Sequence, residues 1–262
     1  MATEESPKIK LYWLEKSRAQ SILWLLEELK IDYELELIHR NKETMLAPPK
    51  LKEIHPLGKS PVISITPPGS EKPIVIAETG FIAQYLSEHF GQNSTLVPKR
   101  WKDGQEGKVG GETEQWMRWM YLLHYTEGSL MTILMMALVL GMLKGPKVPF
   151  FIRPITTMVV NQAFSSFVGP NIKTHLSFLE DQLATSGGDY LCGENLTSAD
   201  IVVSFPLITY QTRFKEIGTW EDSPEKLYPK VWAYINRIDS HPGYKRSADK
   251  IKEIDDSFGV RW

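Results

Sequence analysis

The order of strand and helix patterns along the chain limits its fold more than any other feature of the sequence. Up to Gly91, short alternating or apolar segments typical of strands are interleaved with amphipathic segments typical of helices. From about residue 105 onward, strand patterns largely disappear and long helical patterns follow one another. The sequence therefore predicts an α/β domain followed by an all-α domain.

The first part of the chain predicts the order βαβαββα. Strands are expected over residues 9–14, 33–40, 61–65 and 72–77, and helices over residues 17–30, 47–55 and 78–91. Residues 92–111 are polar and glycine-rich, as in a linker. We therefore predict an N-terminal domain over residues 7–91, a linker over 92–104 and a helical domain over 105–255.

Composition excludes several classes of protein. The chain has 262 residues and a net charge of −2, so it has no basic field to hold a nucleic acid. Its single cysteine, Cys192, excludes an internal disulfide and a cysteine-rich zinc site, and it fits a reducing compartment. The N-terminal residues MATEESPKIK are polar where a secretory signal would be apolar, so we expect a cytoplasmic protein.

One segment, LMTILMMALVLGML over residues 130–143, is almost wholly apolar. It is shorter than the roughly 20 residues that a helix needs to span a bilayer. We expect a buried core helix, and the alternative is an apolar surface that contacts a ligand or a membrane.

Three loops at the ends of predicted strands carry possible chemistry. In the first, Ser17 and Gln20 have the spacing of a capping box, which would only start a helix. The same position also suits an anion, because free N–H groups and the helix dipole meet there, and a hydroxyl can donate to a bound thiolate. The residues alone leave both roles open.

The second loop is HPLGKSPV, where Ser60-Pro61 precedes a strand. A cis peptide bond there would turn the backbone of Ser60 toward an extended peptide ligand, whereas a trans bond would be an ordinary start to a strand. In the third loop, Thr79 can cap the helix that follows, or its turn can bind a carboxylate while Glu78 pairs with an ammonium group. A carboxylate and an ammonium group together describe the head of an amino acid.

Farther along, Thr197 and Asp200 form a second capping-box pattern in NLTSADIV. We interpret this pattern as the start of a buried central helix in the second domain, without a catalytic role.

Taken together, the segments YWLEKSRA, LAPPKLKEIHPLGKSPVI, IAETGFIAQYL and YLCGENLTSADI resemble the glutathione transferases, most closely the yeast-type members of fungi and bacteria. The resemblance extends from residue 9 to about 205, and residues 130–170 match only in being helical. It implies a thioredoxin-like N-terminal domain, an all-α C-terminal domain, a homodimer, a cytoplasmic detoxification role, and glutathione as co-substrate without a metal.

The resemblance also implies where glutathione binds. Its cysteinyl part is expected at the backbone of Ser60 before a cis Pro61, and its γ-glutamyl end at Glu78 and Thr79. Arg18, beside Ser17, belongs to the expected site. The glycine carboxylate is expected to meet Lys59 or Arg40. Family members more often carry serine where this chain has Thr79, which keeps the hydroxyl.

Two family patterns coincide in the first loop. Some classes activate glutathione with a tyrosine at the end of the first strand, where Tyr12 lies, and others with a serine at the following helix start, where Ser17 lies. The pair Ser17-Arg18 resembles the yeast-type pattern, so we predict Ser17 and hold Tyr12 as the alternative. A hydroxyl cannot form a mixed disulfide, which argues against a thiol-disulfide reductase.

The expected function is the activation of glutathione as a thiolate that attacks a hydrophobic electrophile or an organic peroxide. Tyr12, Trp13, Tyr121 and Tyr125 are expected to line the pocket of that electrophile. Two alternatives stay open, a related binding or regulatory protein without turnover and a dedicated biosynthetic or ether-cleaving transferase.

Overall fold

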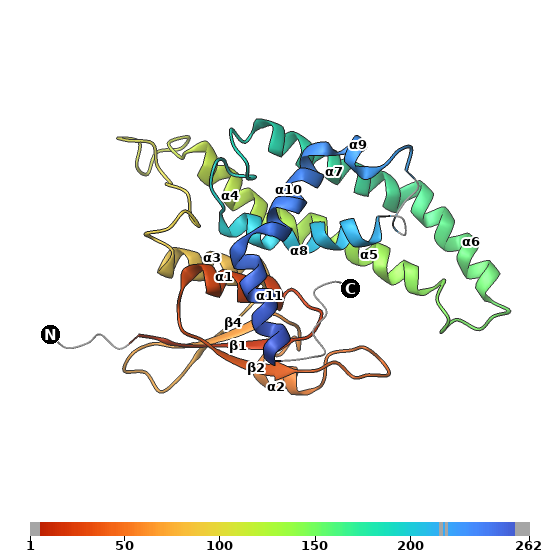
Figure 1. Cartoon of the computed structure of the whole chain (residues 1–262). Helices are drawn as coiled ribbons and strands as arrows, with labels where there is room; N and C mark the ends of the chain where they lie inside the picture. Colours follow the sequence, from red (N-terminus) through yellow and green to blue (C-terminus); the bar gives the residue numbers. More distant parts are fainter. Residues whose placement is uncertain (1–5, 215–216, 218–219, 255–262) are drawn as a thin grey trace.

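The computed structural model describes residues 6–214, 217 and 220–254. A four-stranded sheet with helices on both faces lies at one end of the molecule, and a group of longer helices lies against it (Figure 1). This arrangement confirms the predicted thioredoxin-like domain followed by a helical region.

The N-terminal part follows the predicted order βαβαββα. Its elements are β1 (Lys8–Leu14), α1 (Ala19–Leu29), β2 (Glu34–Ile38), α2 (Lys50–Ile54), β3 (Val62–Thr66), β4 (Ile74–Ala77) and α3 (Thr79–Phe90). The strand order is β2-β1-β3-β4. Strand β1 runs parallel to β2 and antiparallel to β3, with Tyr12 opposite both Glu36 and Val62. The central position of β1 places its C-terminal end, and the loop that follows it, at the middle of the sheet edge.

Helices cover both faces of this sheet. Helices α1 and α3 lie on the face turned toward the helical region, whereas α2 lies on the opposite face (Figure 1). Below the sheet, Leu14, Ile38 and Leu51 form a small core of their own, separate from the main one. Alternation along β1 produces this division, because successive side chains of a strand point to opposite faces.

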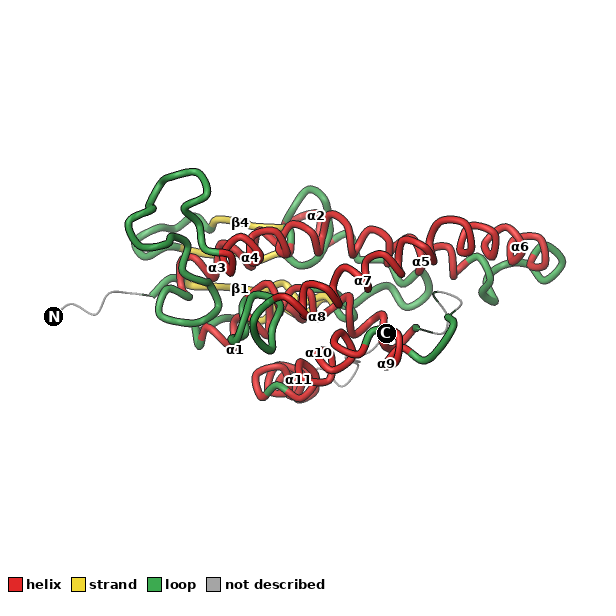
Figure 2. Tube along the Cα trace, turned by 90° about the horizontal axis from the view of Figure 1, so that it is seen from above, coloured by secondary structure: helices red, strands yellow, loops and turns green. Residues whose placement is uncertain are grey.

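The helical part consists mainly of long helices. Its elements are α4 (Glu114–Tyr125), the π-helical turn η1 (Thr126–Leu130), α5 (Met131–Met142), α6 (Arg153–Ala163), the π-helical turn η2 (Phe164–Val168), α7 (Gly169–Thr185), α8 (Ser198–Arg213), α9 (Pro224–Leu227), α10 (Pro229–Ser240) and α11 (Pro242–Ile254). Helices α4 and α5 continue one another through η1, and α6 and α7 continue one another through η2. Helices α5 and α6 reach the end of the molecule opposite the N-terminus (Figure 2).

Helix α8 is the buried centre of the helical part, as the capping-box pattern predicted. The Asp200 carboxylate is fully buried and accepts hydrogen bonds from the backbone N–H groups of Thr197 and Leu191 and from the Tyr234 hydroxyl, at 2.8, 2.9 and 2.8 Å. Burial raises the pKa of the Asp200 carboxyl, and these hydrogen bonds oppose the rise. One carboxylate thus joins the start of α8 to the preceding loop and to α10.

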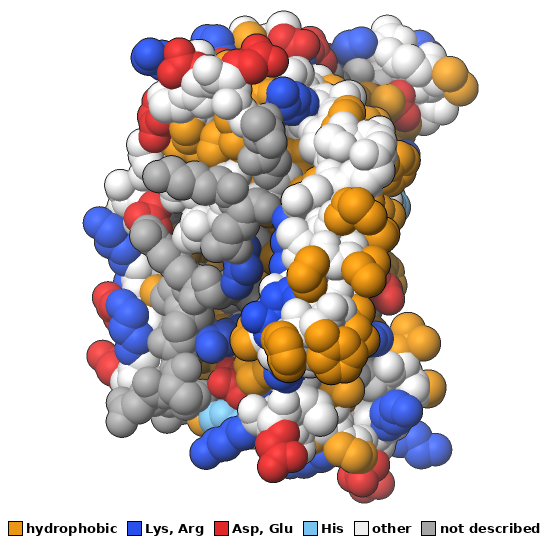
Figure 3. Space-filling model, turned by 90° about the vertical axis from the view of Figure 1, so that its right-hand side faces the viewer, with side chains coloured by type: hydrophobic (Ala, Val, Ile, Leu, Met, Phe, Trp, Pro, Cys, Tyr) orange, Lys and Arg blue, Asp and Glu red, His pale blue; other side chains and the backbone are white. Residues whose placement is uncertain are grey.

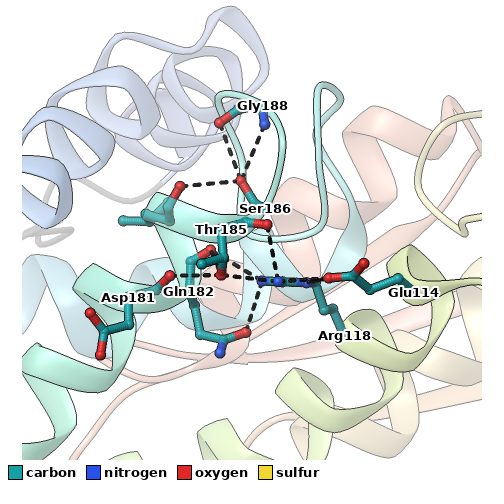
Figure 4. A network of polar contacts seen from close by, with 8 residues as sticks. Glu114, Arg118, Asp181, Gln182, Thr185, Ser186 and Gly188 are labelled. Atoms are coloured by element: carbon teal, nitrogen blue, oxygen red, sulfur yellow. Dashed lines mark hydrogen bonds and ion pairs between the residues drawn. The ribbon is translucent and has the colours of Figure 1, made fainter.

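Arg118 joins α4 to the end of α7 (Figure 4). Its guanidinium donates to the backbone oxygens of Gln182 and Thr185, both at 3.1 Å, and forms an ion pair with Glu114 at 2.8 Å. The last carbonyls of a helix have no partner within the helix, so a cation at that point satisfies them.

The apolar segment 130–143 is only partly the core helix that we expected. Leu130, Ile133, Leu134 and Ala137 are buried, but the alternate face of α5 is exposed, including Met142 at 68%. The α4–α5 helix, Glu114–Met142, is also long and apolar enough to cross a membrane by length and composition. One face of α5 packs in the protein core, so the prediction of a buried core helix holds for that face and not for the opposite one.

We predict that Asp200→Ala lowers the free energy of unfolding by about 3 kcal/mol or more, because it leaves buried donors without an acceptor. Equilibrium unfolding in urea measures this change. Asp249→Ala is the matched control, because Asp249 is exposed and forms an ion pair with Lys252, and such a surface pair contributes less than about 1 kcal/mol. Equal losses in the two variants would contradict the role given to Asp200.

Candidate active site

The Ser17 hydroxyl lies in the loop between β1 and α1, and its side chain is almost fully buried. Its Oγ donates to the Leu14 carbonyl at 2.7 Å and accepts from the Ala19 N–H at 3.1 Å. The Ser60 hydroxyl lies 3.1 Å away, so two loops that are distant in sequence meet at this atom. A hydroxyl held by the first N–H group of a helix lies where an anion is stabilised.

The capping box predicted for this loop does not form. Helix α1 begins at Ala19 with Arg18 at its cap position, and the Gln20 amide donates to the Tyr244 hydroxyl at 3.2 Å instead of turning back to the loop. Ser17 therefore makes a short local turn with Ala19. The Gln20 side chain can bond either the backbone of its own loop or the Tyr244 hydroxyl of α11. It bonds the tyrosine, because that hydroxyl is a buried partner.

Tyr12, the alternative to Ser17, points to the other side of the sheet. Its ring packs with the small core of Leu14, Ile38 and Leu51 beneath the sheet, and its hydroxyl lies 3.5 Å from the Ser64 hydroxyl. Its side chain is thus directed away from the α1 side of the sheet, where Ser17 meets Ser60.

The Ser60-Pro61 peptide bond is cis. The family resemblance implied a cis bond here, and the alternative was an ordinary trans bond at the start of a strand. Lys59, directly beside Ser60, is exposed. Pro61 leads into β3, which is paired with β1 on one side and β4 on the other.

At the third loop, Glu78 occupies the cap position of α3 and Thr79 is the first helical residue, so Thr79 does not cap the helix as we considered. Glu78 has a φ of 74°, a left-handed conformation that is uncommon outside glycine and is enriched at functional sites. Thr79 is buried and Glu78 is exposed. The backbone conformation turns the chain sharply from β4 into α3.

Glycine at position 80 allows α3 to approach the helical part closely. A Cβ atom at Gly80 would lie 2.9 Å from the Leu123 carbonyl oxygen of α4, which is closer than real Cβ contacts. Larger side chains here would push α3 away from α4. This close approach is what brings the Glu78-Thr79 turn next to the π-helical turn η1.

Glu127 of η1 is the residue of the site that the sequence reasoning missed. Its carboxylate pairs with the Arg18 guanidinium, and its side chain is only 18% exposed. Burial raises the pKa of the Glu127 carboxyl, whereas Arg18 and the Thr79 hydroxyl lower it, and burial prevails. The signal in the sequence was an acid directly before a long apolar segment, since Glu127 is the last Asp or Glu before Glu180.

An open cavity of about 320 Å³ lies between the start of α3 and the α4–η1 helix. Glu78 and Glu127 line it from its two sides, together with His124 and Phe81. The chain of contacts from Ser60 to Ser17, and from Arg18 to Glu127, links this cavity to the serine loop. A ligand with an ammonium group would meet the Glu78 carboxylate here, beside the ion pair of Glu127 with Arg18.

Arg40, one of the two residues predicted to meet the glycine carboxylate, contacts backbone oxygens in the structure. Its guanidinium donates to the carbonyls of Glu15 at 3.1 Å, Lys16 at 3.1 Å and Met45 at 3.0 Å. Burial lowers the pKa of the guanidinium and Glu15 opposes this shift. Through these three hydrogen bonds Arg40 holds the loop before Ser17, and its contact with a glycine carboxylate stays a prediction.

Two of the predicted pocket residues are buried, whereas Tyr121 is 53% exposed and its place in the pocket stays a prediction. Trp13 is completely buried in the main core, so it does not line a pocket. Tyr125 is 7% exposed, and its hydroxyl lies 2.8 Å from His175 of α7. Tyr121 stacks on Tyr125 and also contacts α7. The 3.6-residue period of α4 explains this, because it directs residues 121 and 125 to α7 and residues 123, 124 and 127 to the cavity.

The described residues contain no group of three or more His, Cys, Asp or Glu side chains that could hold a metal ion.

Comparison with known proteins identifies the family. Residues 17–89 match the glutathione S-transferase N-terminal domain, and residues 152–246 match the C-terminal domain. Glutathione S-transferase 1 of Saccharomyces cerevisiae is 31% identical over 253 residues, which cover 96% of this chain and 99% of that protein. The chain belongs to the glutathione S-transferase family. The predicted function, a glutathione transferase, is thus confirmed at the level of the family.

Solved structures support the same fold for this transferase. A glutathione S-transferase from Actinobacillus pleuropneumoniae is 27% identical, with a TM-score of 0.63 over 97% of this chain and all of that one. A family member from Pseudomonas fluorescens, whose structure has two glutathione molecules bound, has a TM-score of 0.62 over 91% of each chain at 21% identity.

We predict that the Glu127 carboxyl of this transferase titrates above the ordinary glutamate pKa of about 4.3. Carbon NMR of the labelled carboxyl measures it, and Arg18→Gln should raise it further, because the paired cation is removed. Since the folded-state pKa is raised, this group favours the folded state at low pH, and its contribution is lost as the pH rises through that pKa.

Glu127→Gln is the control for the stability effect, because it removes the titrating group and should flatten that part of the curve of stability against pH. A Glu127 pKa at or below the ordinary value would contradict the dominance of burial at this position.

Proposed function

We propose that this transferase binds glutathione along the N-terminal domain and activates it as a thiolate with the Ser17 hydroxyl. The observation that carries the proposal is the meeting of Ser17 and Ser60 at 3.1 Å, beside the first N–H group of α1. The thiolate then attacks a hydrophobic electrophile, with organic peroxides as a second class of acceptor.

The energetic demand on the site is moderate. A thiol of pKa about 8.5 is only about 3% thiolate at pH 7. Lowering its pKa by about two units requires about 2.7 kcal/mol of preferential stabilisation of the anion. A hydroxyl that donates to the anion contributes about 1.5–3 kcal/mol, and a helix N-terminus adds about 0.3–1 kcal/mol. These contributions together meet the demand without a metal.

The Ser17 hydroxyl has to rotate before it can donate a hydrogen bond to the glutathione thiolate. Its single proton is donated to the Leu14 carbonyl, and it must rotate toward a sulfur that lies near Ser60. The bond accepted from Ala19 can persist through that rotation, because it uses a lone pair of Oγ. Tyr12 is the weaker candidate, because its ring packs beneath the sheet.

The two ends of glutathione are assigned to separate groups. Its γ-glutamyl carboxylate is placed at the N-terminal turn of α3 with Thr79 and near Arg18, and its ammonium group at Glu78, with Glu127 as an additional carboxylate. Its cysteinyl backbone pairs with Ser60 before Pro61, and its glycine carboxylate meets Lys59. These assignments rest on the cavity between Glu78 and Glu127 and on the exposure of Lys59.

The place of the electrophile, the cellular role and the oligomeric state are assigned from the family. We place the electrophile beside Ser17 in the space between the two parts of the chain, and we assign the protein to cytoplasmic detoxification as a homodimer. Ile74 and Val75 on edge strand β4 and Phe81 on α3 are exposed apolar residues that support pairing of two copies. A binding protein without turnover is the second candidate, and the activity measurement below separates the two.

We predict that Ser17→Ala raises the pKa of the bound glutathione thiol by one to two units and lowers kcat/KM for a model electrophile about 10- to 100-fold, which corresponds to the loss of one hydrogen bond to an anion. The ultraviolet band of the thiolate, followed against pH, measures the first quantity, and steady-state kinetics measure the second.

Ser21→Ala is the matched control, because Ser21 is a buried serine four residues later, inside α1, and should change neither quantity. Tyr12→Phe tests the alternative. If Tyr12→Phe abolishes the thiolate and Ser17→Ala does not, the assignment of Ser17 is wrong. If wild-type protein binds glutathione without turnover of any electrophile, the enzymatic role fails.

A further inference from the structure

The side chain of Gln20 is held away from the serine loop by a residue of helix α11. Its amide donates to the Tyr244 hydroxyl at 3.2 Å, and the two side chains are only 8% and 4% exposed. Gln20 lies in the first turn of α1, three residues after Ser17, whereas Tyr244 belongs to α11, which lies across α1 (Figure 1). A buried hydrogen bond thus joins the start of α1 to a helix more than 220 residues farther along the chain.

Other contacts also hold α11 on α1. Near the far end of α1, Lys250 Nζ lies 2.8 Å from the Glu27 carboxylate. The Tyr244 ring packs edge to face on Trp24, with 5.3 Å between the ring centroids. Because neither contact uses the Tyr244 hydroxyl, removal of that hydroxyl alone should leave the ring and the helix in place.

A second partner for the Gln20 side chain lies in its own loop. Ser17 and Gln20 have the spacing of a capping box, in which the serine Oγ accepts from the Gln20 N–H while the Gln20 carboxamide accepts from the Ser17 N–H. A buried carboxamide without a partner is costly, so a Gln20 side chain released from α11 would turn to this arrangement. The Tyr244 hydroxyl therefore selects between two hydrogen-bonded states of the first turn.

A capping box would take the Ser17 hydroxyl out of the arrangement that suits a thiolate. In the structure, Ser17 Oγ accepts from the Ala19 N–H at 3.1 Å and lies 3.1 Å from the Ser60 hydroxyl, while the Gln20 N–H donates to the Ser17 carbonyl at 3.3 Å. The capping box requires Oγ to turn from the Ala19 N–H toward the Gln20 N–H. A hydroxyl turned in that direction loses its place beside Ser60, where the sulfur of glutathione is proposed to bind.

We propose that Tyr244 is a positioning residue for the reaction, because it holds the Gln20 carboxamide on α11 and so keeps the capping box from closing on Ser17. Tyr244 acts through Gln20 and not on the sulfur itself. The inference rests on the proposed role of Ser17, and it gives α11 a part in the chemistry of the N-terminal domain.

The first test is Tyr244→Phe in the full chain. We expect the pKa of the bound glutathione thiol to rise by about half to one unit and kcat/KM for a model electrophile to fall about 3- to 10-fold. The effect is smaller than that of Ser17→Ala, because the hydroxyl is diverted and not removed. The ultraviolet thiolate band, followed against pH, and steady-state kinetics measure the two quantities.

Gln20→Met separates this role from a loss of stability. Methionine is unbranched like glutamine but has no amide, so Gln20→Met breaks the same hydrogen bond and cannot complete a capping box. We expect it to keep the wild-type thiolate pKa, and we expect Gln20→Met combined with Tyr244→Phe to restore kcat/KM to within about twofold of wild type. A hydrogen bond that only stabilised α11 on α1 would instead leave both single variants and the double variant impaired alike.

Tyr33→Phe is the matched control. The Tyr33 hydroxyl donates to Glu27 near the other end of α1, so this variant also removes one hydroxyl that holds the helix. It leaves the first turn untouched and should change neither the thiolate pKa nor kcat/KM.

Pairing of two copies should be the same in all of these variants. Figure 3 shows hydrophobic side chains gathered on the side of the molecule where α5 and α6 end, and Met142 and Met158 of these helices are exposed. Gln20 and Tyr244 are buried between α1 and α11, so their substitution leaves that side unchanged. Analytical ultracentrifugation of each variant checks this point.

The crystal structure of Tyr244→Phe tests the inference without glutathione. We expect the Gln20 carboxamide to be turned to the Ser17 N–H. A Gln20 side chain that still faces α11, or a double variant as impaired as Tyr244→Phe, would overturn the inference and leave Ser17 its role. An unchanged thiolate pKa in Ser17→Ala would overturn the proposed function, and the role of Tyr244 with it.

Discussion

Burial of helix α1 on every side is the constraint on which the rest of the structure depends. All eight residues from Ala19 to Leu26 are buried, between the sheet below, α3 and α8 beside them and α11 across them. Each large apolar side chain buried there contributes about 1.5–3 kcal/mol. A helix held in this way cannot shift, so its first N–H group, and the Ser17 hydroxyl that accepts from it, have a fixed position relative to β1 and β3.

Two arginines extend that constraint to the loops. Arg40 holds the backbone ahead of Ser17 through three carbonyls, and Arg18 joins the start of α1 to Glu127 on the helical part. The Glu127 carboxylate is therefore an interdomain contact and a wall of the cavity at the same time. Movement between the two parts of the chain would change the charge that a ligand meets beside Glu78, which couples the site to the packing of the domains.

Local patterns predicted the fold well, because each strand and helix of the N-terminal part has its own periodicity and each helix of the C-terminal part has its own apolar face. The loops at Ser17, Ser60 and Glu78 were also recognisable, since strand ends and turn residues mark them. The failures concern long-range geometry. Trp13 and Tyr125 were expected in a pocket, but the burial of β1 and the packing of α4 on α7 direct both side chains into the protein. Glu127 was missed because its partner, Arg18, is distant in sequence.

The central claim is that the hydroxyl at the start of α1 acts on the sulfur of glutathione. The crystal structure of the glutathione complex tests it most directly. We expect the sulfur within hydrogen-bond distance of Ser17 Oγ, the bond from the Ala19 N–H retained, and the bond to the Leu14 carbonyl lost. A sulfur bound near another donor, with Ser17 still bonded to Leu14, would contradict the account.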